Sequence, residues 1–551
     1  RAVILASKVD AVPGATGYTN LRDQFRRPLM VLLWTTGLVL LIACANFANL
    51  LLVRGSARAK EIALRFAIGA GRRRIVRQLL TESLMLGTMG AALGLALASA
   101  GSRMLVAMLS SGRRDPIALD LAPDLTMLAF TSAAAVVTGI LFGLAPALRA
   151  TAAGPGVVLK SSTGVTSRAS GRLLAPVVVF QVAVSMVLLI GAGLFVRTLQ
   201  NLQHVHAGFR HEGVLLVNVD GQRAGYKGPG LTAFYRSLME RLSRLPGVRS
   251  ASASGNTPLS GGIWTDDVTV GDRKAHAHFN TVSPGYFATM GTPLIAGRDF
   301  NSGDEDGSRN VCIVSQAFAK ALGGIGSQVL APGAKAPVEV VGIVGDTVSQ
   351  SLREKAPPTI YSPYFREGSR ISIATIELRV QGSLTQVADL VRKEIRSALP
   401  RTATQAQVQG LTEQVERTLM QERLLAALGS AFGVLALVLA AVGLYGLLAY
   451  TVSRATSEIG IRMALGAQRG EVVWMVLRGA LRLIAIGVVV GAPAGWAASR
   501  VVASALFGLE PGDPTTITAA AILLAGTAMA AAWIPARRAS RVDPMVALRW
   551  E

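Results

Sequence analysis

Apolar blocks separated by short charged loops constrain this chain more than any other feature. Seven of the blocks are about 18 or more residues long, which is enough for a helix to cross a hydrocarbon layer ~30 Å thick. We expect membrane spans at about Pro28–Val53, Leu79–Leu109, Leu125–Leu148, Leu174–Leu199, Leu424–Tyr450, Val472–Leu506 and Thr516–Ile534. The composition agrees, because only 16% of the 551 residues are charged, against about 25% in soluble proteins.

Positive charge gathers in the loop after the first span, the loop after the fifth span and the C-terminal tail. The cations there are Arg54, Arg58, Lys60, Arg65, Arg72, Arg73, Arg74, Arg77, Arg454, Arg462, Arg469, Arg537, Arg538, Arg541 and Arg549. Because basic loops stay in the cytoplasm, we expect the N-terminus and the region Gln200–Gln421 to lie outside and the C-terminus inside. The same rule accounts for the net charge of +22, so we do not expect nucleic acid as a partner.

The chain also repeats itself. The segment Glu61–Ala70 recurs as Glu458–Ala467, and in each copy one span precedes it and two follow. Self-similarity with charged residues at fixed offsets indicates an internal duplication with both copies in the same orientation. The last four spans and the polar region then form one complete unit, and the first three spans form the back half of another. We therefore expect a further span and a further external domain before Arg1.

This organisation divides the chain into six segments. They are the tail of a missing external domain (1–26), a first membrane domain of three helices (27–150), a cytoplasmic linker (151–173), a single span (174–199), an external domain with helical stalks (200–421) and a second membrane domain of three helices (422–551). The expected fold class is an α-helical polytopic membrane protein, with about seven transmembrane helices and a mixed α/β external domain.

Periodicity within the external region predicts both strands and helices. The expected strands are Val214–Val219, the buried Val311–Val314 and Val338–Gly345, and the half-buried Ala374–Val380, and the expected helices are Leu231–Leu245 and Gln386–Leu399. Gln200–His206 and Thr412–Gln421 are expected as stalks that continue the fourth and fifth spans. About 190 residues are enough for an independent core.

The repeated cytoplasmic segment is the candidate functional site. Its glutamate and arginine are four residues apart, as partners on one face of a helix are, and its glycine fits a helix C-terminus. Two interpretations stay open, a charged connector that anchors the helix ends and a docking helix for a cytoplasmic partner, and recurrence in both copies favours docking. The candidate residues are Glu61, Arg65, Gly69, Ala70, Glu458, Arg462, Gly466 and Ala467.

Signatures of catalysis and of cofactor binding are not found in the sequence. It contains no G-x-x-x-x-G-K-[ST] phosphate loop and no G-x-S-x-G nucleophile elbow. His276 and His278 have no supporting cluster of metal ligands nearby in sequence, so we expect exposed histidines. Cys44 and Cys312 fall in different environments and are not expected to pair. We expect no catalytic, cofactor-binding or metal-ligating residue in this chain.

Amide residues occur within the first span. Asn46 and Asn49 are three residues apart, and the repeat replaces them with Gly443 and Gly446. Small or amide residues at such spacing are typical of helix–helix packing in membranes. Carboxylates in the middle of the spans are scarce, which argues against an ion-coupled secondary transporter.

These motifs together resemble the MacB/FtsX-type ABC transporter permeases, and within them the duplicated orphan permeases of acidobacteria. The resemblance covers essentially the whole chain. It rests on both repeated segments, on Asp513-Pro514 and Pro535–Pro544, and in the external region on Val282–Phe287, Gly297–Phe300, Val341–Asp346 and Tyr361–Tyr364.

The resemblance implies a multi-pass inner-membrane permease without its own ATPase. A separate cytoplasmic ABC ATPase would dock on the two cytoplasmic helices and use ATP, and long stalks would transmit the motion to the external domain. Related members expel antibiotics from the periplasm, extract lipoproteins or regulate cell-wall hydrolases. Substrate export and regulation of an envelope enzyme are therefore both open, with a periplasmic adaptor or envelope protein and membrane lipid as further partners.

Overall fold

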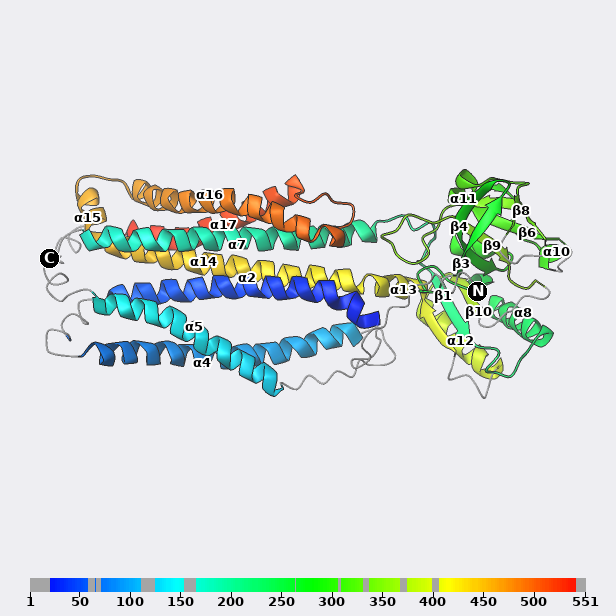
Figure 1. The fold of residues 1–551 in the computed structure, drawn as a ribbon, viewed down its shortest axis with the longest axis horizontal. Helices are drawn as coiled ribbons and strands as arrows, with labels where there is room; N and C mark the ends of the chain where they lie inside the picture. The colour runs from blue at the N-terminus through cyan, green and yellow to red at the C-terminus, as the bar shows by residue number, and fades with distance from the viewer. Residues whose placement is uncertain are drawn as a thin grey trace. The chain divides into compact units, whose positions relative to one another are not determined.

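The computed structural model describes residues 20–57, 65, 71–110, 124–152, 165–262, 264–305, 309–330, 336–366, 374–398 and 406–541. The chain forms two compact units. One, here called the helical unit, comprises Arg1–Thr198 and Glu422–Glu551, and the other, the external unit, comprises Leu199–Gln421. The elements that the structure describes in the first unit are helices, whereas a sheet with helices builds the second (Figure 1).

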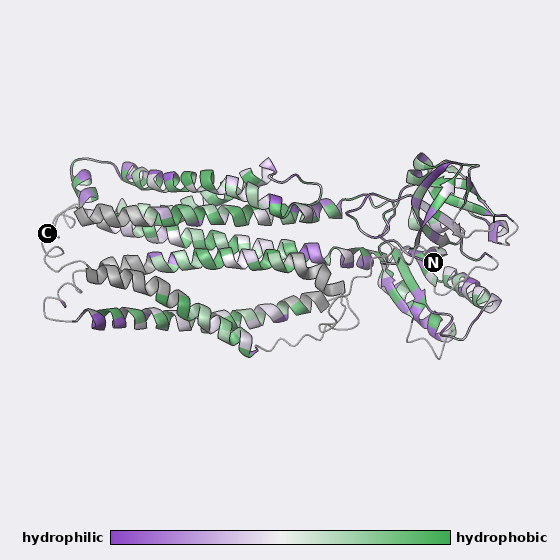
Figure 2. Ribbon diagram, viewed as in Figure 1, coloured by the Kyte–Doolittle hydropathy of each residue, from purple (hydrophilic) through white to green (hydrophobic). Residues whose placement is uncertain are grey.

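The long helices carry the predicted spans. They are α2 (Asn20–Ala57), α4 (Arg72–Ser110), α5 (Leu125–Ala152), α7 (Val165–Gln203), α14 (Met420–Arg454), α16 (Arg469–Val501) and α17 (Pro514–Ala539). Within the described residues, six of them are long and apolar enough to cross a membrane, and α5 has a shorter apolar stretch, Leu125–Val137. Figure 2 shows hydrophobic residues along the coloured parts of α2, α4, α7, α14 and α16. The count of seven spans stays a prediction.

Helix α7 forms the centre of the helical unit. Of its most apolar window, 67% is buried, more than in any other described span. Its apolar residues share one core with α14, α16 and α17, and Figure 1 shows these helices running alongside one another. On α16, Gly487, Gly491 and Gly495 face α7, and a Cβ at any of them would collide with Val182, Ala183 or Ile190. Glycine is required here because it lets two membrane helices approach closely.

The two copies of the membrane domain meet through equivalent helices. Val39 and Ile42 of α2 share a buried cluster with Ala436 of α14 and with residues of α7. Val39 and Ala436 are separated along the chain by the same offset as Glu61 and Glu458. The two copies therefore pack against each other through α2 and its own repeat, α14.

The external unit contains a mixed sheet. Its strands, within the described residues, are β1 (Val214–Val219), β2 (Val248–Ser254), β3 (Trp264–Val270), β4 (Arg273–Val282), β5 (Leu294–Gly297), β6 (Val311–Ser315), β7 (Gln328–Val329), β8 (Val338–Val344), β9 (Thr359–Pro363), β10 (Ala374–Val380) and β11 (Gln407–Gly410). The order is β11-β1-β10-β2-β4-β9-β6-β8-β5, with β3 on β4 and β7 on β8. The pairs β4–β9 and β6–β8 are parallel and the others are antiparallel.

Helices cover this sheet. Helices α8 (Pro229–Ser243) and α12 (Leu384–Ala398) pack on the apolar side of β1, β2 and β10. The shorter helices of the unit are α9 (Tyr286–Met290), α10 (Ser302–Glu305), α11 (Gln316–Ala321) and α13 (Leu411–Thr418). The predicted strands and helices of this region are therefore present, and the mixed α/β fold class is confirmed.

Two local predictions are wrong. The alternation in β10 predicts a half-buried strand, yet six of its seven residues are buried. The reason is that α8 and α12 cover one face while α9 packs on the other. The prediction that the stalk Thr412–Gln421 continues the fifth span also fails, because α13 ends at Thr418, Leu419 caps it, and α14 starts as a separate helix at Met420.

Candidate functional site

The repeated segment of the second copy forms a short helix, α15 (Thr456–Ala464). Ile459 is 1% exposed and packs with Val472 of α16 and Ala539 of α17, so an apolar contact anchors the helix to the helical unit. Gly466 follows with φ +99°, and its N–H bonds to Met463 O while the N–H of Ala467 bonds to Arg462 O. This pattern of bonds ends a helix with a glycine in the left-handed region. The predicted C-terminal stop at Gly466 is confirmed.

The predicted ion pair also forms on α15. Arg462 Nη2 lies 2.6 Å from Glu458 Oε1, and the two side chains are 51% and 67% exposed. Such an exposed pair adds at most about 0.5 kcal/mol to stability. Ile461 and Leu465 of the same helix and Trp474 of α16 are exposed as well. Together these five residues form what we call the α15 surface, where charged and apolar side chains lie side by side.

The first copy repeats one contact of this surface. Of Glu61, Arg65, Gly69 and Ala70, only Arg65 lies within the described residues, where it is exposed and helical. Its Nη1 donates to Gln78 Oε1 of α4 at 3.2 Å, as Arg462 Nη1 contacts Met475 Sδ of α16 at 3.1 Å. Gln78 and Met475 are equivalent positions of the repeat. Both copies therefore direct this arginine to the same place on the following helix.

A polar cluster lies at the opposite end of α17. Asp513 caps this helix by accepting the backbone N–H of Thr516 at 2.9 Å, and the guanidinium of Arg197 on α7 contacts both Asp513 and the Thr515 hydroxyl. Burial raises the pKa of Asp513, but hydrogen bonds from Thr516 and Thr515 and the charge of Arg197 outweigh it and lower the pKa to about 2. The sequence signal for the cap is Asp followed by Pro. No signal indicates Arg197 as its partner.

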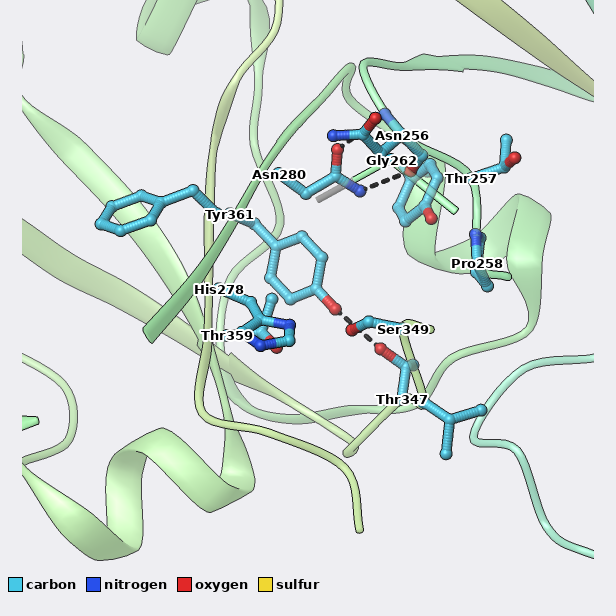
Figure 3. Close-up of a pocket in the computed structure, with 13 residues that line it drawn as sticks. Asn256, Thr257, Pro258, Gly262, His278, Asn280, Thr347, Ser349, Thr359 and Tyr361 are labelled. Carbon is cyan, nitrogen blue, oxygen red and sulfur yellow. Dashed lines mark hydrogen bonds between the residues drawn. The ribbon is translucent and has the colours of Figure 1, made fainter. Parts of the chain in front are cut away.

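The external unit contains a small polar pocket between β4, β9 and the neighbouring loops. Figure 3 shows the Tyr361 hydroxyl directed toward Thr347, with the His278 ring beside it; the two oxygens are 2.9 Å apart. The cavity measures about 40 Å³, room for roughly three water molecules. Its lining has no acidic or basic side chain apart from His278, and burial lowers the pKa of that ring. The pocket therefore suits neutral polar groups.

The expectation of exposed histidines holds for only one of the pair. His276 is 61% exposed and lies 3.0 Å from Asp267. His278 is partly covered, and its Nδ1 is buried without a partner among the described residues. The reason is the parallel pairing of β4 with β9, which places Thr359 opposite His278, a long-range contact that the sequence does not reveal. No group of metal-binding side chains occurs in the described part of the chain.

A buried carboxyl is also missed by sequence reasoning. Glu377 of β10 is 0% exposed, and the hydroxyls of Ser252 and Ser254 donate to it at 2.8 and 2.5 Å. Burial raises its pKa to about 7 in spite of these hydrogen bonds. In the sequence Glu377 stands in an apolar strand where alternation predicts an exposed position.

Two known protein families match this chain, each over a different part of it. Residues 35–155 and again 430–544 match the FtsX-like permease C-terminal family. Residues 178–411 match the MacB-like periplasmic core domain. This chain therefore contains two FtsX-like permease regions and one MacB-like periplasmic core region. It is a multi-pass protein of the inner membrane. Both repeated segments, Glu61–Ala70 and Glu458–Ala467, fall within the FtsX-like matches, and the polar pocket falls within the periplasmic core match.

Individual relatives agree with this assignment. The permease is 30% identical over 296 residues to the macrolide export ATP-binding/permease protein MacB of Rhodopseudomonas palustris (strain HaA2), over 52% of this chain and 45% of that protein. It is 26% identical over 359 residues to the uncharacterized ABC transporter permease YknZ of Bacillus subtilis (strain 168), over 59% of this chain and 86% of that protein. The permease spans about half the length of the MacB relatives it matches.

Among solved structures, the periplasmic region of MacB from Actinobacillus actinomycetemcomitans is 18% identical. The match covers 40% of this chain and 98% of that one, with a TM-score of 0.28. Membership of the acidobacterial duplicated group stays a prediction.

Proposed function

We propose that this chain is the permease subunit of an ABC transporter that works with a separate cytoplasmic ATPase. Two FtsX-like regions and a MacB-like periplasmic core support the proposal. The relative from R. palustris is named an ATP-binding/permease protein, while the 551 residues of this chain contain no phosphate-loop motif. ATP would therefore be bound by the partner, and this chain would carry no cofactor of its own.

The observation that carries the proposal is the α15 surface. Its apolar anchor, Ile459, fixes the helix to α16 and α17, whereas Glu458, Arg462 and Leu465 stay exposed. A force applied to α15 therefore reaches two spans directly. We assign the docking of the ATPase to this surface and to its counterpart at Glu61, Arg65, Gly69 and Ala70. The movement would be transmitted through α7 and α14 to the external unit and used to export or extrude a substrate.

Regulation of a cell-envelope enzyme is the alternative, and the small pocket of the external unit is compatible with it. The pocket beside His278 measures about 40 Å³, far below the roughly 300 Å³ of sites for drug-sized ligands. An external unit of this kind would act by contacting a protein, either a periplasmic adaptor or an envelope enzyme. Capture of partners by the full-length protein distinguishes the two functions, because an adaptor supports export and a hydrolase supports regulation.

Charge exchange on α15 tests the docking assignment. E458R/R462E reverses both charges but keeps an ion pair within the helix, so the pair itself is preserved. If the surface docks the ATPase, the exchange lowers the activity of the co-purified ATPase about tenfold, equivalent to about 1.4 kcal/mol of lost coupling. The matched control is E240R/R244E at the C-terminal end of α8, which carries an exposed pair of the same spacing at 2.5 Å. Equal activity in the two exchange variants would contradict the assignment.

A further inference from the structure

Three helices meet at one polar point in the helical unit. Asn46 Nδ2 of α2 and Gln181 Nε2 of α7 both donate to the backbone carbonyl of Leu439 on α14, at 2.8 and 2.5 Å. An apolar cluster that includes Ile42, Val184 and Ala436 lies about one helical turn away along the same three helices. Because each amide uses its nitrogen on Leu439, each has its oxygen left for another donor.

These two oxygens accept no hydrogen bond from the part of the chain that the structure describes. Asn46 Oδ1 and Gln181 Oε1 are both buried and unpaired among the described residues. They converge beside Gly443 of α14, where a Cβ would lie less than 3.0 Å from each of them. A buried acceptor without a donor costs about 1–3 kcal/mol, and within a membrane no lipid group supplies the missing bond.

Reorienting the amides does not remove the cost. If either amide were flipped, its oxygen would face the carbonyl oxygen of Leu439, and neither atom carries a hydrogen to donate. Since no described residue donates to either oxygen, both need another donor. A water molecule carries two donors and no charge, which matches two neutral acceptors. A metal cation would need about six oxygen ligands.

We propose that Gly443 keeps open a buried site for one water molecule, which donates to Asn46 Oδ1 and Gln181 Oε1. The glycine is required because any side chain would occupy the space where the two oxygens converge. Asn49, one turn further along α2, is 6% exposed and has both amide atoms unpaired among the described residues, so the polar seam extends along this helix.

The site exists because the two copies have diverged. Asn46 and Gly443 are equivalent positions of the repeat, so the first copy supplies the amide and the second supplies the open space. The water joins α2 of the first copy to α7 of the second. The water molecule fixes the register of α2 against α14, because it can bind only where the amide of α2 lies opposite the glycine of α14.

The structure of the full-length protein in nanodiscs, at a resolution that shows water, tests the site. We expect a peak about 3 Å from both oxygens, unchanged when alkali cations are replaced by an organic buffer cation. G443A should remove the peak, whereas the control G446A should keep it, because nothing lies within 4 Å of a Cβ at Gly446.

Three outcomes would overturn the proposal. They are two amides bonded directly to each other without a peak, a peak that depends on alkali cations, and a peak that survives G443A. Because G443A could disturb folding, Q181M provides a second variant of similar volume. It removes one acceptor, and we expect the occupancy of the peak to fall about fivefold, for a loss of about 1 kcal/mol. Undiminished occupancy in Q181M would count equally against the site.

Discussion

The two copies of the membrane domain place the same glycine pattern in opposite surroundings. Gly487 and Gly491 of α16 are buried against α7. Their equivalents on α4, Gly90 and Gly94, are exposed, and no described atom lies within 4 Å of a Cβ built on either. A pattern of small residues therefore indicates a helix face that can pack closely. Whether that face is buried depends on whether another helix covers it.

Alanine substitution at these glycines tests the difference between α16 and α4, and it has the largest expected effect on stability. A Cβ at Gly491 would lie 2.8 Å from the backbone of Ala183, which cannot move without shifting α7. We expect G491A to destabilise the protein by about 1–3 kcal/mol. G94A should be neutral or stabilising by up to about 1 kcal/mol, since alanine favours a helix. Thermal unfolding of the two variants in the same detergent measures the difference, and equal melting temperatures would contradict it.

The next effect concerns the two N-cap aspartates. Asp513 of α17 and Asp124 of α5 occupy equivalent positions and each accepts a backbone N–H, but Asp513 also contacts Arg197. Because the pKa of Asp513 is lowered to about 2 in the folded protein, its carboxylate stabilises the fold above pH ~4 and loses this effect as the pH falls toward ~2.

Asparagine substitution tests this second difference while keeping the cap. D513N should cost about 2 kcal/mol at pH 7, from a pKa shift of roughly two units, and about half as much at pH 3. D124N, at an exposed residue, should change stability by less than about 0.5 kcal/mol. Melting curves at the two pH values check both variants. A cost for D513N that does not shrink in acid would rule out the charge as its source.

The smallest expected effect concerns the arginine contact that both copies share. Arg65 and Arg462 are both exposed and contact equivalent positions on the next helix. We expect R65A and R462A each to change stability by less than about 0.5 kcal/mol, measured by thermal unfolding. A loss of ATPase coupling in either variant then reports on docking rather than on folding. A large destabilisation in only one of them would show that the two contacts are not equivalent.

Local patterns predicted the elements of this permease, and long-range contacts decided what the sequence could not predict. Strand β1 follows from an apolar run, strand β10 from alternation, and the C-terminus of α15 from a glycine after a helix. The burial of His278 depends on β9, about 80 residues further along the chain, where no local signal exists. Gln181 stands in an apolar span with no indication that its amide meets Asn46 and Gly443. Which residues bind the ATPase stays a prediction.

Helix α2 packs against its repeat, α14, and disulfide formation in the membrane tests this pairing. V39C and A436C are introduced after Cys44 and Cys312 are replaced, with a protease site within residues 153–164. Both positions are buried in one cluster, whereas Leu40 is 47% exposed, so L40C with A436C is the control. We predict that the V39C–A436C disulfide holds the two fragments together after proteolysis. It should form about tenfold faster than the control disulfide, which corresponds to a difference of about 1.4 kcal/mol in activation free energy. Equal rates, or fragments that separate, would contradict the pairing.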